Sequence, residues 1–158
     1  MPESNELLSA GAALIGMPLA GPESFSQQQL DYLKRALGVD ETVLWTGSAS
    51  GASATMSLSE AFTNFERVRF YIDEGNSNIP YQTSECETNG NALYLYPSYT
   101  RTNSASALLN GLWTIQSSND HKTFTINIAV LRTNGGTQGT NSAKFVKVVG
   151  VHRISGGN

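Results

Sequence analysis

The spacing of hydrophobic residues changes near residue 40, and this change divides the chain into two parts. In the segment 23–38, Leu30, Leu33 and Leu37 recur at i, i+3 and i+7, which is the spacing of one face of an α-helix. After this segment, hydrophobic and polar residues alternate in short runs, which is the period of a β-strand. The pattern predicts one short amphipathic helix followed by a β-domain.

The ends of the helix are marked by capping residues. Ser26 and Gln29 have the spacing of a capping box, and Gly38 is suited to the left-handed position after a helix. A helix of about three turns is not stable alone in water, so its leucine face must pack against something. That partner is either the chain's own β-domain or the same face of other copies. In the second case the oligomerisation residues are Leu30, Leu33 and Leu37.

Seven runs in the β-rich part have the character of strands: 42–46, 55–58, 67–73, 92–97, 107–116, 122–132 and 144–154. We expect a bulge at Gly111, and near Gly150 either a bulge or a strand buried on both faces. Turn-forming residues separate the runs. Seven or eight such strands predict an antiparallel β-sandwich or a jelly roll. In the strongest run, four residues are expected to face the core: Phe124, Ile126, Ile128 and Val130.

The N-terminal segment is aliphatic but is interrupted by Gly and Pro, which exclude a long regular element. It is either an unstructured terminus or an extended arm that docks on a partner. We therefore divide the chain into an arm (1–22), a helical stem (23–39) and a β-sandwich head domain (40–158). The expected anchoring residues of the arm are Leu7, Leu8, Leu14, Ile15, Met17 and Leu19.

The composition narrows the range of partners. The net charge is −3 and no basic stripe is present, so binding to nucleic acid through its phosphates is not expected. Only 15% of the residues are charged, and about 60 residues are Ser, Thr, Asn or Gly. The N-terminal segment lacks the basic start of a signal peptide, and its apolar part is too short to cross a bilayer. We expect a chain that is made in the cytosol and does not insert into membranes.

No pattern in the sequence predicts catalysis. His121 and His152 are expected to be ordinary turn and strand residues, and no serine is singled out as a nucleophile. Cys86, the single cysteine, is expected to be half-buried in a strand. The segment that begins at Asp73 has the length of a calcium loop but has Asn78 where that loop needs Gly. We expect no enzyme activity, no cofactor and no metal.

Aromatic residues are the remaining candidates for ligand contact. Trp45 and Trp113 lie in alternating strand patterns and are expected to be core residues. The segment "YLYPSY" is a better candidate for an exposed platform on which a sugar could stack. Its possible glycan contacts are Tyr94, Tyr96 and Tyr99.

Three motifs resemble the C-terminal domain of fibre and appendage proteins of tailed bacteriophages. They are the strand opening Leu44-Trp45-Thr46-Gly47, the hairpin from Ser57 to Glu66, and the terminal strand from Val149 to Ile154. The segment "LIGMPLAGPESFSQQQLDYL" resembles the base of head-fibre proteins, which anchor on the capsid and project outward as trimers.

The resemblance implies a virion structural protein: a homotrimeric head fibre or capsid decoration. Its arm would bind the major capsid protein or another virion protein, and its head would be exposed on the particle surface. The alternative is a receptor-binding tip of the tail-fibre type, which recognises a glycan on the host surface.

Overall fold

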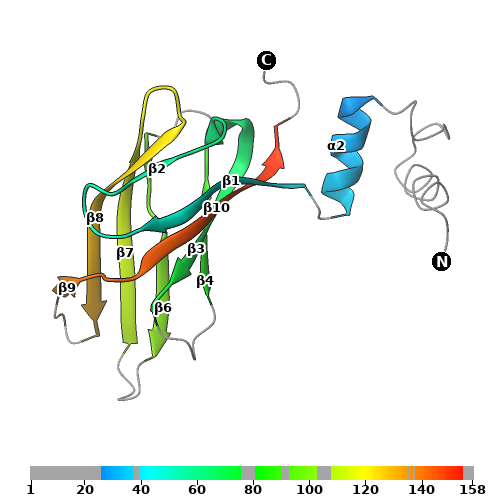
Figure 1. The fold of residues 1–158 in the computed structure, drawn as a ribbon. Helices are drawn as coiled ribbons and strands as arrows, with labels where there is room; N and C mark the ends of the chain where they lie inside the picture. The colour runs from blue at the N-terminus through cyan, green and yellow to red at the C-terminus, as the bar shows by residue number, and fades with distance from the viewer. Residues whose placement is uncertain are drawn as a thin grey trace. The chain divides into compact units, whose positions relative to one another are not determined.

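The computed structural model describes residues 26–37, 40–75, 81–89, 93–102, 108–134, 136 and 138–154. The chain forms two compact units, one of residues 1–40 with 155–158 and the other of residues 41–154 (Figure 1). The six residues expected to anchor the arm lie outside the described residues: Leu7, Leu8, Leu14, Ile15, Met17 and Leu19.

The first unit contains the helix α2 (Gln27–Ala36). The predicted capping box is confirmed, because the Ser26 backbone N–H donates to Gln29 Oε1 (2.9 Å) and the Gln29 backbone N–H donates to Ser26 Oγ (3.2 Å). The last turn closes with a hydrogen bond from the Leu37 N–H to the Leu33 carbonyl. No helix in the described part of the chain is long and apolar enough to cross a bilayer.

The second unit is an antiparallel β-sandwich, as the sequence predicted. Sheet A has the strand order β1-β10-β3-β4, and sheet B has the order β2-β8-β7-β5, with β6 also paired to β7 and β9 also paired to β8 (Figure 1). The strands of sheet A are β1 (Glu41–Ala49), β3 (Phe65–Asp73), β4 (Gln82–Glu87) and β10 (Lys144–Arg153). Those of sheet B are β2 (Thr55–Ser57), β5 (Tyr94–Leu95), β6 (Ser98–Thr102), β7 (Leu108–Ser117), β8 (Thr123–Thr133) and β9 (Gln138–Thr140).

Aromatic rings join the two sheets across the core. Phe70 of sheet A contacts Phe124 of sheet B with ring centroids 5.7 Å apart, and Phe145 of sheet A contacts Trp113 of sheet B at 4.7 Å. Trp113 is buried, and Trp45 is half-buried against the same core, so both tryptophans are core residues as predicted. Burial of these rings is the main source of sandwich stability.

The core face of β8 differs from the prediction. Phe124 and Ile126 face the core, but Ile128 is 51% exposed and Val130 lies outside the core cluster. The cause is a β-bulge: Ile115 of β7 pairs with Ile126 and Thr114 pairs with Ile128, so Asn127 is an extra residue. One inserted residue turns every following side chain to the opposite face.

The two glycines expected to mark bulges instead make room for rings. A Cβ atom at Gly111 would collide with the ring of Tyr99 on the neighbouring strand, and one at Gly150 would lie 2.5 Å from the Phe65 ring. The bulge of β10 lies between Phe145 and Lys147, four residues before Gly150. The strand is buried from Val148 to Val151, which fits the alternative of a strand covered on both faces.

Three strands were not predicted. β4 and β6 are short and carry mainly polar residues, and β9 lies in a segment with turn composition. β5 and β6 pair with β7 in one continuous register, since Leu95 lies opposite Ile115 and Ser98 lies opposite Leu112. They form one edge strand that is interrupted at Pro97, a residue that edge strands tolerate.

Candidate ligand-binding groove

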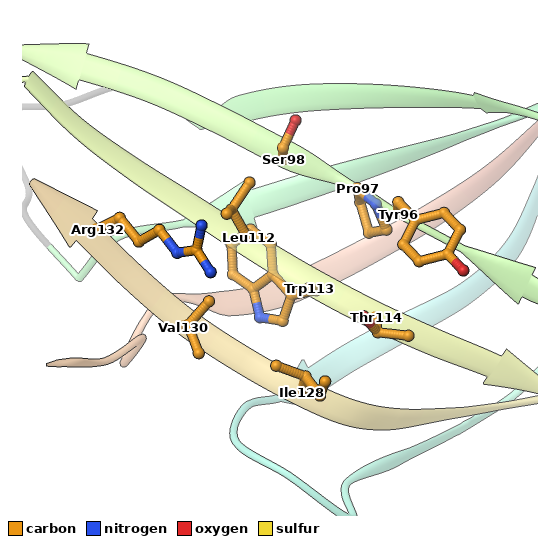
Figure 2. A pocket seen from close by; sticks show the side chains of 9 residues that line it. All are labelled: Tyr96, Pro97, Ser98, Leu112, Trp113, Thr114, Ile128, Val130 and Arg132. Atoms are coloured by element: carbon orange, nitrogen blue, oxygen red, sulfur yellow. The ribbon is translucent and has the colours of Figure 1, made fainter. Parts of the chain in front are cut away.

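A groove of about 300 Å³ lies on the face of sheet B that points away from the core. Figure 2 shows its lining, which comes from the edge strand and from β7 and β8. We call it the outer groove. Its volume is at the lower end of the range of small-molecule sites. Its lining residues are Tyr96, Pro97, Ser98, Leu112, Trp113, Thr114, Ile128, Val130 and Arg132.

The strand register places the lining side chains in rows. Ser98, Leu112 and Val130 lie on adjacent strands, because Leu112 pairs with both of the others. In the next row Thr114 pairs with Ile128. The edge-strand register continues through Tyr96, which therefore lies beside Thr114. Alternation along each strand turns these residues to the outer face, and the adjacent residues to the core.

The bulge in β8 creates the apolar floor of this groove. Without the extra residue Asn127, the side chains of Ile128 and Val130 would point into the core, where the sequence pattern placed them. With it, both join Leu112 on the outer face. An exposed apolar surface is unfavourable in water, so a bulge that produces one indicates a site that a ligand covers.

Amide and hydroxyl groups border the groove. The Thr100 hydroxyl donates to Asn110 Oδ1 (2.7 Å), and the Asn127 amide donates to Gln116 Oε1 (3.0 Å). Each pair holds its partners in position across two neighbouring strands. These side chains retain further donors and acceptors that a ligand could use.

The three tyrosines of the predicted platform do not share one surface. Tyr96 is 67% exposed and Tyr94 is 46% exposed, both on the outer face. Tyr99 corrects the prediction, because it is only 7% exposed and packs on Trp113 with ring centroids 5.6 Å apart. Burial also raises the pKa of the Tyr99 hydroxyl, together with the nearby Glu74 carboxylate. Alternation explains the difference, since odd-numbered residues of this edge strand face inward.

The outer face of sheet A has a different chemistry. Arg69 donates to both Glu41 and Glu85, and Arg67 also pairs with Glu85 at 2.9 Å. This network crosses β10 above Val149, which is buried although it lies outside the core between the sheets. The long arginine stems are suited to covering such a residue. Lys147 adds a cation–π contact with the Tyr71 ring at 4.6 Å.

His121 lies near a serine and an aspartate but not in a catalytic arrangement. Its Nδ1 is 3.4 Å from the Ser117 hydroxyl, which donates to the Ser118 carbonyl. The Asp120 carboxylate accepts from Ser118 and from the Lys122 backbone N–H, so it does not orient the histidine. His121 is a turn residue with φ of 58°, as the sequence suggested, and its ring and that of Phe62 make an edge-to-face contact.

The remaining candidate residues from the sequence lie in a strand or a turn and form no recognisable functional site. His152 is a strand residue of β10, and burial raises the pKa of the half-buried Cys86 thiol to about 11. The Asp73 carboxylate accepts the Gly75 N–H (2.7 Å), as in a tight turn. No group of three or more His, Cys, Asp or Glu residues within the described ranges could hold a metal ion.

The leucines of the helix differ in exposure. Leu33 is 4% exposed, Leu30 is half-buried, and Leu37 is 68% exposed. Leu33 is thus covered within a single chain, whereas the sequence left open whether this leucine face packs on the chain itself or on other copies. The exposed apolar surface of this helix comes mainly from Leu37 and from Tyr32, which is also exposed.

The outer groove combines an exposed aromatic ring, an apolar floor and a polar border, which is the composition of a site for a small amphipathic ligand. Comparison with known protein families gives no match to any family model, and comparison with curated proteins gives none either.

Proposed function

We propose that this chain is a non-catalytic structural protein of a tailed-phage virion, a homotrimeric head fibre or capsid decoration. Residues 1–22 would anchor it to a capsid or other virion protein, and the β-sandwich would be displayed outward. The proposal draws on the three sequence motifs. The observation that carries it is the division of the chain into a β-sandwich and a separate unit whose described part contains a short helix.

A ten-residue helix needs tertiary or quaternary contacts to be stable. Leu37 and Tyr32 leave apolar surface on it that other copies could cover. Association of three copies would also join three weak arms, and their combined attachment would be much stronger than that of one arm.

Light scattering on the full chain tests this proposal. We expect three times the monomer mass at micromolar concentration, and a smaller mass for Leu37→Ser. Because Leu37 is exposed, its replacement should not unfold the monomer. Lys34→Ser, on the same helix and also exposed, is the matched control and should leave the mass unchanged. A monomeric wild-type chain would contradict the proposal.

We propose a second candidate function, recognition of a host-surface saccharide through the outer groove. The observation that favours it is the position of Tyr96, which is 67% exposed beside an apolar floor and the hydroxyl side chains of Ser98 and Thr114. Sugars have apolar C–H faces and hydroxyl edges, and a tyrosine ring with polar neighbours suits both.

A printed array of bacterial surface saccharides, probed with the full chain, tests this candidate. We expect selective binding that Tyr96→Ala removes. Tyr81→Ala is the matched control, because Tyr81 is 60% exposed but does not line the groove. Equal loss of binding in both variants, or no binding by the wild type, would rule the candidate out.

A further inference from the structure

The strands of sheet B are almost free of charge. Within the strands that the structure describes, β2, β5, β6, β7, β8 and β9 contain only two charged residues, Arg101 and Arg132. Arg101 pairs with Glu74, whose carboxylate is buried. Arg132 is exposed, and it is the one charged residue among the nine that line the outer groove.

Arg132 lies at the opposite end of the groove from Tyr96. On β8 it is four residues from Ile128, which belongs to the Tyr96 row, and four residues of a strand span about 13 Å. Figure 2 shows the Arg132 side chain extending toward Leu112 and the middle of the groove. A ligand that touches both ends must therefore have an apolar face at one end and can have an anion at the other.

We infer that the outer groove binds an acidic saccharide, a sugar chain with a carboxylate that pairs with Arg132 while a neighbouring sugar ring stacks on Tyr96. This inference rests on the proposed saccharide recognition and adds the chemical class of the ligand. It makes Arg132 the residue that separates acidic sugars from neutral ones.

Charge complementarity supports a carboxylate. The planar guanidinium forms two parallel hydrogen bonds with a carboxylate, a pairing that a lysine cannot reproduce. The strands of sheet B contain no carboxylate residue in the described part of the chain, so none of them repels an anion. A phosphate monoester carries about −1.5 to −2 charges and would be only partly neutralised by one arginine.

Isothermal titration of the full chain with matched disaccharides tests the inference. The probes are digalacturonate, diglucuronate and dimannuronate, each beside its carboxyl-reduced neutral counterpart, and glucose 6-phosphate as the phosphate probe. We expect at least one uronate disaccharide to bind about tenfold or more tightly than its reduced form, as a charge-assisted hydrogen-bonded pair implies.

Variants of the chain test whether Arg132 causes the preference for the acidic sugar. Arg132→Gln should bind the acidic and the reduced sugar equally, Arg132→Lys should retain only part of the preference, and Tyr96→Ala should weaken both sugars. Arg67→Gln, on the outer face of sheet A, is the matched control and should behave as wild type.

The outcomes separate the inference from the function on which it rests. Equal binding of acidic and reduced sugars, with both lost in Tyr96→Ala, would overturn the inference and leave saccharide recognition intact. An acidic preference that survives Arg132→Gln, or tighter binding of glucose 6-phosphate, would also overturn the inference. No binding of any sugar would overturn both proposals.

Discussion

The strands of sheet A contain ten charged residues and those of sheet B contain two, although both sheets are built from strands of similar total length. In sheet A the charges are balanced, and four of them form one ion-pair network on the outer face. The ten residues are Glu41, Glu66, Arg67, Arg69, Asp73, Glu85, Glu87, Lys144, Lys147 and Arg153.

The two sheets differ in how the apolar residues on their outer faces are shielded from solvent. Sheet A covers Val149 of β10 with its own arginine and glutamate side chains, and of its outer face Val43 stays exposed. Sheet B leaves Tyr96, Leu112 and Ile128 in contact with solvent. An exposed apolar sheet face promotes aggregation. Short edge strands and Pro97 limit this risk at the edges of sheet B. A ligand for sheet B would account for a face that folding alone does not require.

The largest expected effect is on the stability of the sandwich, and it should differ between the inner and the outer face of β7. Trp113→Ala should destabilise the sandwich by about 3–5 kcal/mol, because it opens a cavity between Tyr99 and Phe145. Leu112→Ala, one residue earlier and on the outer face, should cost less than about 1 kcal/mol. Urea unfolding of both variants measures the difference. Similar losses would mean that the outer face is also part of the core.

The next effect concerns acid stability. Hydrogen bonds from Arg153 to both oxygens of Glu60 hold the pKa of that carboxyl below its ordinary value near 4.5, with Asn64 contributing. The pair therefore stabilises the fold fully above pH 4.5, and its contribution is lost as the pH falls through the lowered pKa.

Glu60→Gln should lower the free energy of unfolding by about 1 kcal/mol at neutral pH, a value kept small because the pair is partly exposed. The loss should shrink as the pH falls below 4.5 and through the lowered pKa of Glu60, where wild type also loses the charge. Urea unfolding at pH 7 and pH 3 measures both quantities. An equal difference at the two pH values would contradict the assigned role.

A smaller effect is expected from the ion-pair network of sheet A. Arg69→Met keeps much of the apolar stem but removes the charge between Glu41 and Glu85, and should cost about 0.5–1 kcal/mol at low salt. The cost should decrease in 1 M NaCl, where the screening length is about 3 Å. Ile128→Ser on sheet B, which removes no charge, is the comparison variant and should show less salt dependence. Equal salt dependence would remove the contrast between the faces.

Local patterns in the sequence were sufficient for the main elements. The capping box of Ser26 and Gln29 and the β-sandwich class depend on neighbouring residues and on alternation, and both appear as predicted. The identification of Trp113 as a core residue followed from the same alternation.

The outer groove could not be predicted, because it depends on pairing between distant strands. The bulge at Asn127 leaves no mark in an alternating run, yet it turns Ile128 and Val130 outward. Tyr99 was expected at the surface as part of the segment "YLYPSY". Only the register, which puts it over Gly111, shows that the glycine leaves space for the ring.

The smallest effect on stability is expected at Tyr96 and Ile128, where exposed side chains contribute little to folding. Their replacement is therefore the most direct test that sheet B, and not sheet A, is the recognition face. The measurement is binding of the full chain to an array of bacterial surface saccharides, with the double variant Tyr96→Ala/Ile128→Ser on sheet B and Tyr71→Ala/Arg67→Gln on sheet A. The account predicts that the sheet B variant loses binding at unchanged stability and that the sheet A variant keeps it. Loss of binding only in the sheet A variant, or in neither, would contradict it.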